Sequence, residues 1–237
     1  FHRLIVTSAT YRQSSIHPKQ DEYSSRDAAN QLWWHAERRR LDAESLRDRM
    51  LSVGGSLDSR MAGPGFKVTI QPEALEGLSR KEGAWKPSPA QEQLRRSLYS
   101  FSARSLLPPL MTTFDFGDTT LPSGQRPVST VAPQALALLN NTFSHERSSA
   151  LAQAVMSDLA SSSDPLASRP PKAALPDGGE GTRRLDAAIG LAWKRALARE
   201  PSERELAAAR SHFAEQRQRF AGTSLSTEYS VPSPQQP

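Results

Sequence analysis

Residues 121–141, with the sequence LPSGQRPVSTVAPQALALLNN, show in one stretch how this chain is built. The first half carries turn-forming residues and continues as a polar, extended approach. The second half predicts a helix over 133–143, because Pro133 suits a first helical position, where its missing N–H is not needed. The predicted core-facing stripe of that helix is Leu136, Leu139 and Phe143. We interpret the stretch as a joint between a loop and a packed helix, with Arg126 its one residue that has a reason to be functional.

Downstream of this joint, apolar residues at helical spacing predict a helix from about 146 to 160 and a C-terminal helical hairpin over 185–220. The apolar stripe of the first hairpin helix consists of Leu185, Ala188, Ile189, Ala192, Trp193 and Ala196. Ser202 and Glu205 form a Ser-x-x-Glu capping box, which marks the start of the second helix. The short break between the two helices predicts antiparallel neighbours.

Upstream of the joint, residues 1–15 read as a helix, and 30–53 read as two helices or one broken helix. Trp33 lies on an apolar stripe, so core packing is expected for it. Asp42 is a candidate cap for the second of these helices. The side predicted to be apolar is formed by Ala43, Leu46, Met50, Val53 and Leu57. Arg47 is expected on the other, ion-paired side.

Extended structure is expected only in a small β element. Residues 96–104 alternate apolar and polar side chains and could pair with 67–70. Residues 161–184 are rich in Ser, Pro and Gly and predict a disordered linker, and 221–237 predict a frayed tail. The expected fold is therefore mainly α, an irregular multi-helix domain over 1–160 with long ordered loops and this β element, on which the C-terminal helical hairpin packs.

Composition narrows the chemistry of the chain. It has 237 residues, 37% of them hydrophobic, with 18 prolines and no cysteine, which excludes disulfides and Cys-ligated metal within it. No apolar run approaches the roughly 20 residues that span a bilayer. The net charge is +5, but most arginines stand among acidic residues, a pattern typical of ion-paired helix faces rather than of a nucleic-acid patch. No starting Met or signal peptide is present, so the chain reads as part of something longer.

Five segments carry a family resemblance in this order: HRLIVTSATYRQSS, RRRLDAESLRDRMLSVGGSLD, RRSLYSF, STVAPQALALLN and LAREPSERELAAA. Together they resemble the C-terminal domain of unknown function in large secreted proteins of the planctomycete, cytochrome-c-associated type. The resemblance covers residues 1–220. The chain departs from it at Ala62–Gly63–Pro64, where the family tends to have Gly-Gly-Pro, and in a longer insert at 161–184.

The resemblance implies a domain that is secreted or periplasmic and follows other domains of its parent, which often include a cytochrome-like module. It implies that the family domain starts upstream of Phe1, so that this chain is N-terminally truncated. The motif Cys-x-x-Cys-His is absent here, so any haem belongs to a separate module, and no cofactor is expected in this chain. The family has no catalytic residues to carry over.

Seven side chains are the candidate binding residues: Arg12, Trp85, Arg96, Arg104, Asp115, Asp118 and Arg126. Asp115 and Asp118, in a Pro/Gly-bounded loop, could bind a cation or act as acid and base. The alternative is that they shape their own turn and that Arg126 neutralises one of them. No metal site is expected, because the histidines lack ligand spacing.

The other candidates carry weaker expectations. Arg12 could clamp a carboxylate, or it could pair internally with Glu44 or Asp48. Trp85 is the one tryptophan placed in a loop and could stack on a sugar. The arginines that flank the alternating segment 96–104 could border the same groove as the aspartates.

We therefore expect a non-catalytic accessory or interaction domain whose partners are other domains of its parent. The resemblance implies that this parent is linked to extracellular electron transfer or polysaccharide processing. The alternative is a hydrolase-like or polysaccharide-binding domain centred on Arg12, Arg104, Asp115, Asp118 and Arg126. Convergence of these side chains in one pocket, with a perturbed carboxylate pKa, would favour the alternative.

Overall fold

The computed structural model describes residues 1–71, 75, 85–103, 106–117, 122, 124–161 and 179–221. The α-helices of this part are α1 (His2–Thr7), α2 (Gln20–Arg26), α3 (Ala43–Val53), α5 (Pro109–Thr113), α6 (Ala132–Asn140), α7 (Thr142–Ser161), α8 (Gly179–Leu197) and α9 (Glu203–Ala221). Two single 3-10 turns, η1 (Glu92–Leu94) and η2 (Ser97–Tyr99), lie between α3 and α5. The chain is mainly helical, as predicted, and the described residues form no sheet.

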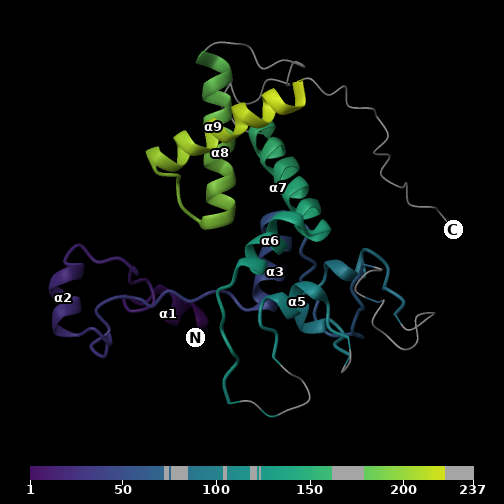
Figure 1. Ribbon diagram of the computed structural model, residues 1–237, viewed down its shortest axis with the longest axis horizontal. Helices are drawn as coiled ribbons and strands as arrows, with labels where there is room; N and C mark the ends of the chain where they lie inside the picture. The colour runs from purple at the N-terminus through teal and green to yellow at the C-terminus, as the bar shows by residue number, and fades with distance from the viewer. Residues whose placement is uncertain are drawn as a thin grey trace.

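Figure 1 shows three regions along the molecule. The helices α7, α8 and α9 occupy one end, α3, α5 and α6 lie in the middle, and the segment with α1 and α2 leaves the middle sideways. The C-terminal helices are present as expected, but α9 crosses α8 steeply and does not run antiparallel beside it. The prediction of antiparallel neighbours from the short connection was therefore wrong.

The interior consists of three small apolar clusters. The first joins α3, α5 and α6–α7 and contains Ala43, Leu110, Met111 and Phe114, with Leu46, Phe116, Ala137 and Phe143 against it. The second lies among the irregular segments and contains Phe66, Val68 and Ile70, with Leu75, Trp85, Tyr99 and Leu106 against it. The third joins α7 to α8 and contains Val155 and Leu159, with Leu151, Ala187, Ala188, Leu191 and Ala192 against it.

The start of α3 is the one that the sequence predicts. The Asp42 carboxylate accepts a hydrogen bond from the Ser45 amide at 2.8 Å, which satisfies one of the free N–H groups of the first turn. The buried face is formed by Ala43, Arg47 and Leu51, four residues apart. Placing Arg47 on the outer side was therefore wrong, since only 4% of this residue is exposed.

The predicted helix over 133–143 is divided in the structure. It ends at Asn140 as α6, and α7 begins at Thr142. The predicted stripe is wrong for two of its three members, because Leu136 and Leu139 are 56% and 67% exposed. The buried residue of α6 is Gln134, whose amide meets polar groups of the preceding loop. The inward side of α6 is therefore the one with Gln134, bonded to this loop, and Ala137, packed against the first apolar cluster.

The predicted β element exists only as bridges between extended segments. Phe66 pairs with Ser100, through the Phe66 amide to the Tyr99 carbonyl at 2.9 Å and the Phe101 amide to the Phe66 carbonyl at 2.7 Å. The expected strand over 96–104 does not form in its described part, where residues 97–99 make the 3-10 turn η2. A hydrogen bond of 2.7 Å from the Ser97 amide to Asp48 on α3 holds this segment out of an extended course.

Three other boundaries differ from those predicted. The helix expected over 1–15 ends at Thr7, and residues 30–41 contain no helix. Trp33 is 69% exposed, so its expected place in the core was wrong. Of the predicted linker and tail, Ser161 ends α7, 179–184 begin α8 and Ala221 ends α9, while 162–178 and 222–237 lie outside the described residues.

Candidate functional site

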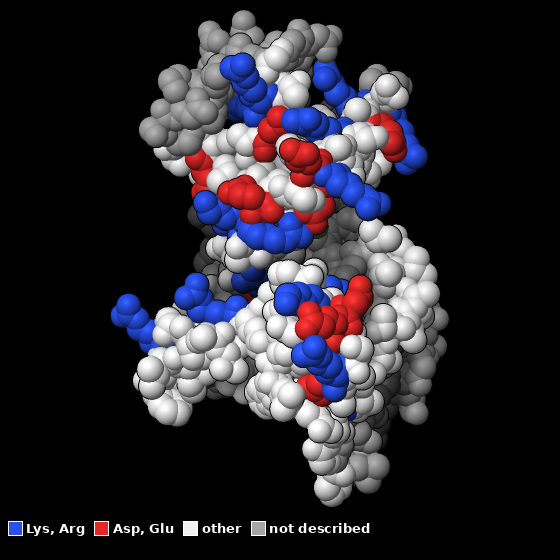
Figure 2. Space-filling view, turned by 90° about the vertical axis from the view of Figure 1, so that its left-hand side faces the viewer, with Lys and Arg blue, Asp and Glu red and all other residues white. Residues whose placement is uncertain are grey.

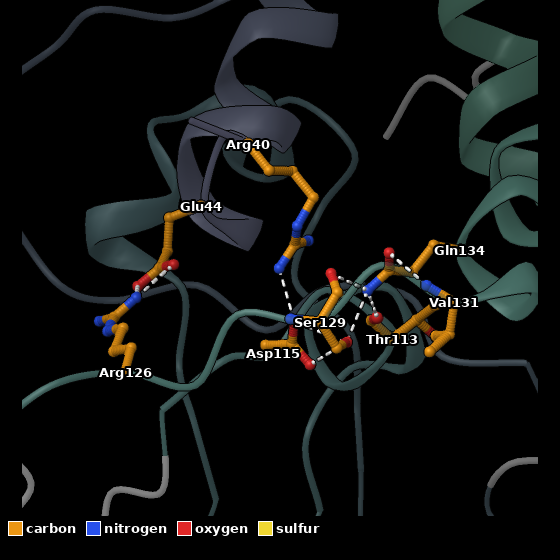
Figure 3. Close-up of polar contacts among 8 residues, drawn as sticks. All are labelled: Arg40, Glu44, Thr113, Asp115, Arg126, Ser129, Val131 and Gln134. Carbon is orange, nitrogen blue, oxygen red and sulfur yellow. Dashed lines mark hydrogen bonds and ion pairs between the residues drawn. The ribbon is translucent and has the colours of Figure 1, made fainter. Parts of the chain in front are cut away.

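The most connected polar cluster of the described residues surrounds Asp115, one of the predicted site residues. Asp115 lies two residues after the end of α5 and adopts a left-handed backbone conformation, with φ of 57°. Aspartate tolerates this conformation better than bulky residues do. The turn directs its side chain towards the extended segment that leads into α6, as Figure 3 shows.

The oxygens of Asp115 are fully engaged by the chain itself. Its carboxylate accepts a hydrogen bond from the Ser129 amide at 2.7 Å and from the Ser129 hydroxyl at 2.9 Å. A guanidinium nitrogen of Arg40, just before α3, donates to the same carboxylate at 2.5 Å. Arg40 also lies over the ring of Phe114. Asp115 thus joins three segments that are far apart in the sequence.

Gln134 completes this cluster from the first turn of α6. Its side-chain amide nitrogen donates to the Thr113 carbonyl at 3.1 Å, and to the Ser129 hydroxyl at 3.1 Å. Its side-chain oxygen accepts a hydrogen bond from the Val131 amide at 3.4 Å, as a glutamine does in a capping box. We refer to Arg40, Asp115, Ser129 and Gln134 as the Asp115 cluster.

The electrostatics keep Asp115 ionised. The backbone amide of Ser129, then its hydroxyl and the charge of Arg40, hold the pKa of Asp115 below its usual value. The pKa of the nearby Asp42 is lowered as well, first by its hydrogen bond from Ser45 and also by the charges of Arg126 and Arg40. A carboxyl group that acts as a general acid at neutral pH needs a raised pKa, the opposite of both shifts.

Arg126 is not part of this cluster and is bound by Glu44 on α3. One of its guanidinium nitrogens lies 2.8 Å from each carboxylate oxygen of Glu44, and the guanidinium stacks over Phe116. A side chain added at Gly117 would meet the Nε of Arg126 at 3.3 Å, so the arginine lies across this glycine. Arg126 pairs with Glu44 and not with Asp115, although Figure 3 shows the two ion pairs side by side. The other aspartate that the sequence suggested, Asp118, lies outside the described residues.

The arrangement holds loops together and leaves no open acid and base. A hydrolase needs one carboxyl group free to reach its substrate, whereas both carboxylate oxygens of Asp115 accept hydrogen bonds from Ser129 or Arg40. In the part of the chain that the structure describes, no group of three or more His, Asp or Glu residues could hold a metal ion. Charges of both signs are interspersed on the face shown in Figure 2.

The remaining predicted site residues do not join Asp115. Arg12 is exposed on the N-terminal segment, and its expected partners Glu44 and Asp48 bind other groups. Arg96 lies 3.9 Å from Asp48 and near the sulfur of Met61. Arg104 and Asp118 lie outside the described residues.

Trp85 is partly buried and does not stand free in a loop. Its indole N–H donates to the Val68 carbonyl at 2.7 Å, and its ring packs against the second apolar cluster. Lys67 lies over the same ring. Its role is the packing one that aromatic residues most often have.

Two buried arginines are the residues that sequence reasoning missed. Arg47 donates to the carbonyls of Gln93 and Arg95 and to the Ser97 hydroxyl, and it stacks between Phe66 and Phe143. Arg95 donates to the carbonyls of Pro64 and Ala62 and stacks on Tyr99. The one available signal was the four-residue spacing of Arg47 with Ala43 and Leu51.

The comparisons identify a family. The model of the family PSD1, described as "Protein of unknown function (DUF1553)", matches residues 1–213. Searches of the curated proteins and of the solved structures found no match. No helix in the described part is both long and apolar enough to cross a membrane.

Proposed function

Since this chain belongs to the PSD1 family of proteins of unknown function, we propose that it is a non-catalytic interaction domain of a larger secreted protein. Its partners are other domains of that protein, which by resemblance is of the planctomycete type with a cytochrome-like module. The parent would serve extracellular electron transfer or polysaccharide processing, with any haem in the separate module.

One observation carries the proposal: the polar side chains that could do chemistry hold the chain's own loops instead. Asp115 is bound by Ser129 and Arg40, and Arg126 is bound by Glu44. Enzyme sites instead leave groups with matched pKa values facing a substrate. A lowered carboxylate pKa with all its contacts internal supports a structural role for Asp115.

The surface of the chain supports a role in binding. Large apolar side chains are exposed at its N-terminal segment and on α6, including Phe1, Leu4, Leu32, Trp33, Leu136 and Leu139. Monomeric soluble proteins rarely leave such residues exposed in groups unless a partner covers them. An interaction domain accounts for these residues, because a partner would cover them.

Calorimetry of this chain and of its parent protein tests the proposal. Docking to another domain stabilises only the folded, docked state, so this domain should melt at a higher temperature inside the parent. Equal melting temperatures for the domain alone and inside the parent would contradict the proposal. The variant Asp115→Asn distinguishes the interaction domain from the enzyme alternative. If Asp115 is structural, any activity of the parent protein should fall only in proportion to the fraction of the variant that remains folded.

A further inference from the structure

The first 41 residues form an arm that the rest of the chain does not support. Among the described residues, no hydrogen bond, ion pair or ring contact joins residues 1–39 to the remainder, and Arg40 makes the first link through Asp115. None of the residues 1–41 is buried, and the first buried residue is Ala43. Figure 1 shows this arm leaving the middle of the molecule sideways.

The arm nevertheless holds a defined shape through its own polar contacts. The Asp27 carboxylate accepts hydrogen bonds from the amides of Gln31 and Leu32, at 3.0 and 2.8 Å. The Asn30 side-chain amide donates to the His35 carbonyl at 2.8 Å, and the Gln13 side chain donates to the Trp33 carbonyl at 2.8 Å. The chain between Asp27 and His35 is thereby folded into a fixed loop.

The two adjacent tryptophans of this loop have opposite surroundings. Trp34 turns inward, donates its indole N–H to the Asp27 carbonyl and packs edge-on against Tyr23. Trp33 has a left-handed φ of 55° and turns outward, and the preceding Leu32 is 81% exposed. A bulky residue in this conformation is strained, so the loop holds Trp33 at the surface against its own backbone preference.

The exposed apolar area of the arm suits a protein interface. Phe1, Tyr11 and Trp33 alone expose about 450 Å², if each such side chain presents about 150–250 Å². With the exposed aliphatic residues, the arm offers on the order of the 800 Å² that one partner contributes to a standard interface. Trp, Tyr and Arg are also the residues that most often dominate binding energy.

The charge of the arm indicates what covers it. Residues 1–41 carry seven Lys and Arg against four Asp and Glu, a net charge of +3. Arg3, Arg12 and Arg38 are exposed, and none of them has an ion-pair partner among the described residues. Unpaired cations on a segment with exposed apolar side chains complement an apolar surface with an acidic rim. A second copy of this arm would repel the first.

We infer that residues 1–41 are a docking arm that binds an apolar, acid-rimmed surface of a partner protein domain, with Leu32 and Trp33 as its anchor. The inference rests on the proposed function and identifies its binding surface, the partner being another domain of the parent. A membrane surface is disfavoured, because the arm's helices have six and seven residues and Asp21, Glu22 and Glu37 would face anionic lipids.

Oxidative footprinting of this chain and of the parent protein tests the inference. Trp33 and Tyr11 should react much more slowly inside the parent, while Phe213 and Phe220 on α9 should react at equal rates and serve as internal controls. Trp33→Ala should reduce the protection of Tyr11 by about 30-fold, the effect of a binding hot spot. The matched control Leu197→Ala, at the exposed end of α8, should leave that protection unchanged.

Charge reversal tests the acidic rim. The double variant Arg12→Glu/Arg38→Glu should weaken protection of Trp33, whereas Arg204→Glu, an exposed arginine on α9, should not. Equal weakening by both variants would overturn the assigned charge complementarity.

Three outcomes would overturn the inference. One is equal oxidation of Trp33 in the isolated chain and in the parent. If the domain still melts at a higher temperature inside the parent, the proposed function stands and the binding surface is a different one. If the melting temperatures are also equal, both the docking arm and the proposed function are contradicted. The second is a dimer of this chain in light scattering that Trp33→Ala dissolves. The third is Trp33-dependent binding to phosphatidylglycerol–phosphatidylcholine vesicles or to polygalacturonate, with no protection in the parent.

Discussion

Replacing Arg47 by methionine tests whether a buried arginine holds the centre of this fold. The change keeps most of the apolar stem between Phe66 and Phe143 but removes the guanidinium. Two carbonyls, of Gln93 and Arg95, then lose their donor in a buried place. Each unsatisfied buried group costs about 1–3 kcal/mol, so the loss is about 2–6 kcal/mol.

An opposing effect reduces this figure. Burial lowers the pKa of Arg47 to about 10, so the charged form is already disfavoured in the folded chain. Removing the charge relieves that cost, and replacing buried charges by apolar groups is sometimes stabilising. We therefore expect a loss near the lower end of the range, about 2–3 kcal/mol, because the carbonyls have no replacement donor.

Thermal unfolding followed by circular dichroism measures the effect. A loss of 2–3 kcal/mol corresponds to a melting temperature lower by about 5–10 °C in a chain of this size. Arg204→Met, at an exposed position, is the matched control and should change stability by less than about 0.5 kcal/mol. A variant Arg47→Met that melts at or above the wild-type temperature would refute the reasoning.

Three further predictions follow from particular contacts. Asp115→Asn should lower the melting temperature at pH 7. Because the pKa of Asp115 is lowered in the folded chain, its carboxylate stabilises the fold above about pH 3.8 and loses this effect as the pH falls below that value. The difference in melting temperature between variant and wild type should therefore shrink in acid. Leu136→Asp should be tolerated because this position is exposed, whereas Leu159→Asp should unfold the chain, with a cost above about 4 kcal/mol, as measured by urea titration. Ser202→Ala should cost about 1 kcal/mol in the same titration, because its hydroxyl accepts the Glu205 amide at the start of α9. Equal stability of the Leu136→Asp and Leu159→Asp variants would contradict the burial assigned to Leu159. An unchanged urea midpoint of the Ser202→Ala variant would contradict the cap assigned to α9.

Local signals in the sequence were sufficient for several parts of the fold. Asp42 caps α3, and Ser202 with Glu205 caps α9, since both contacts lie within one helical turn. The mainly helical class follows from apolar spacing in the long helices. On α8, Ala188 and Ala192 of the predicted stripe pack against Val155 and Leu159, together with Ala187 and Leu191 from outside that stripe. Such features depend on neighbours in sequence, and so they could be predicted.

The candidate site could not be predicted, because its contacts join distant segments. Arg40 meets Asp115, and Glu44 meets Arg126, across 75 and 82 residues. The sequence indicated that Asp115 and Arg126 were unusual, but nothing local shows which partner each one takes. The exposure of Leu136 could not be predicted either, because it depends on a distant contact. Gln134 of the same helix faces inward and donates to the Thr113 carbonyl, which leaves Leu136 at the surface.

The arginine content explains how a chain with few apolar residues stabilises its irregular segments. Of its 30 basic side chains, 24 are arginine, and only 37% of its residues are hydrophobic. The irregular segments near α3 pair with no sheet, so their carbonyls need donors from elsewhere. Arg47 and Arg95 supply them, each to two carbonyls, while stacking on Phe66 or Tyr99.

Lysine could not replace these arginines, because one ammonium is not a planar fork that reaches two carbonyls and covers a ring at once. This requirement separates the two kinds of arginine in the chain. Arg47 and Arg95 complete the interior by donating to backbone carbonyls, whereas Arg3, Arg12 and Arg38 on the arm have no ion-pair partner within the described chain. The exposed set therefore belongs to the surface for which we infer a partner, and the buried set explains how the middle of the molecule holds its shape through its own contacts.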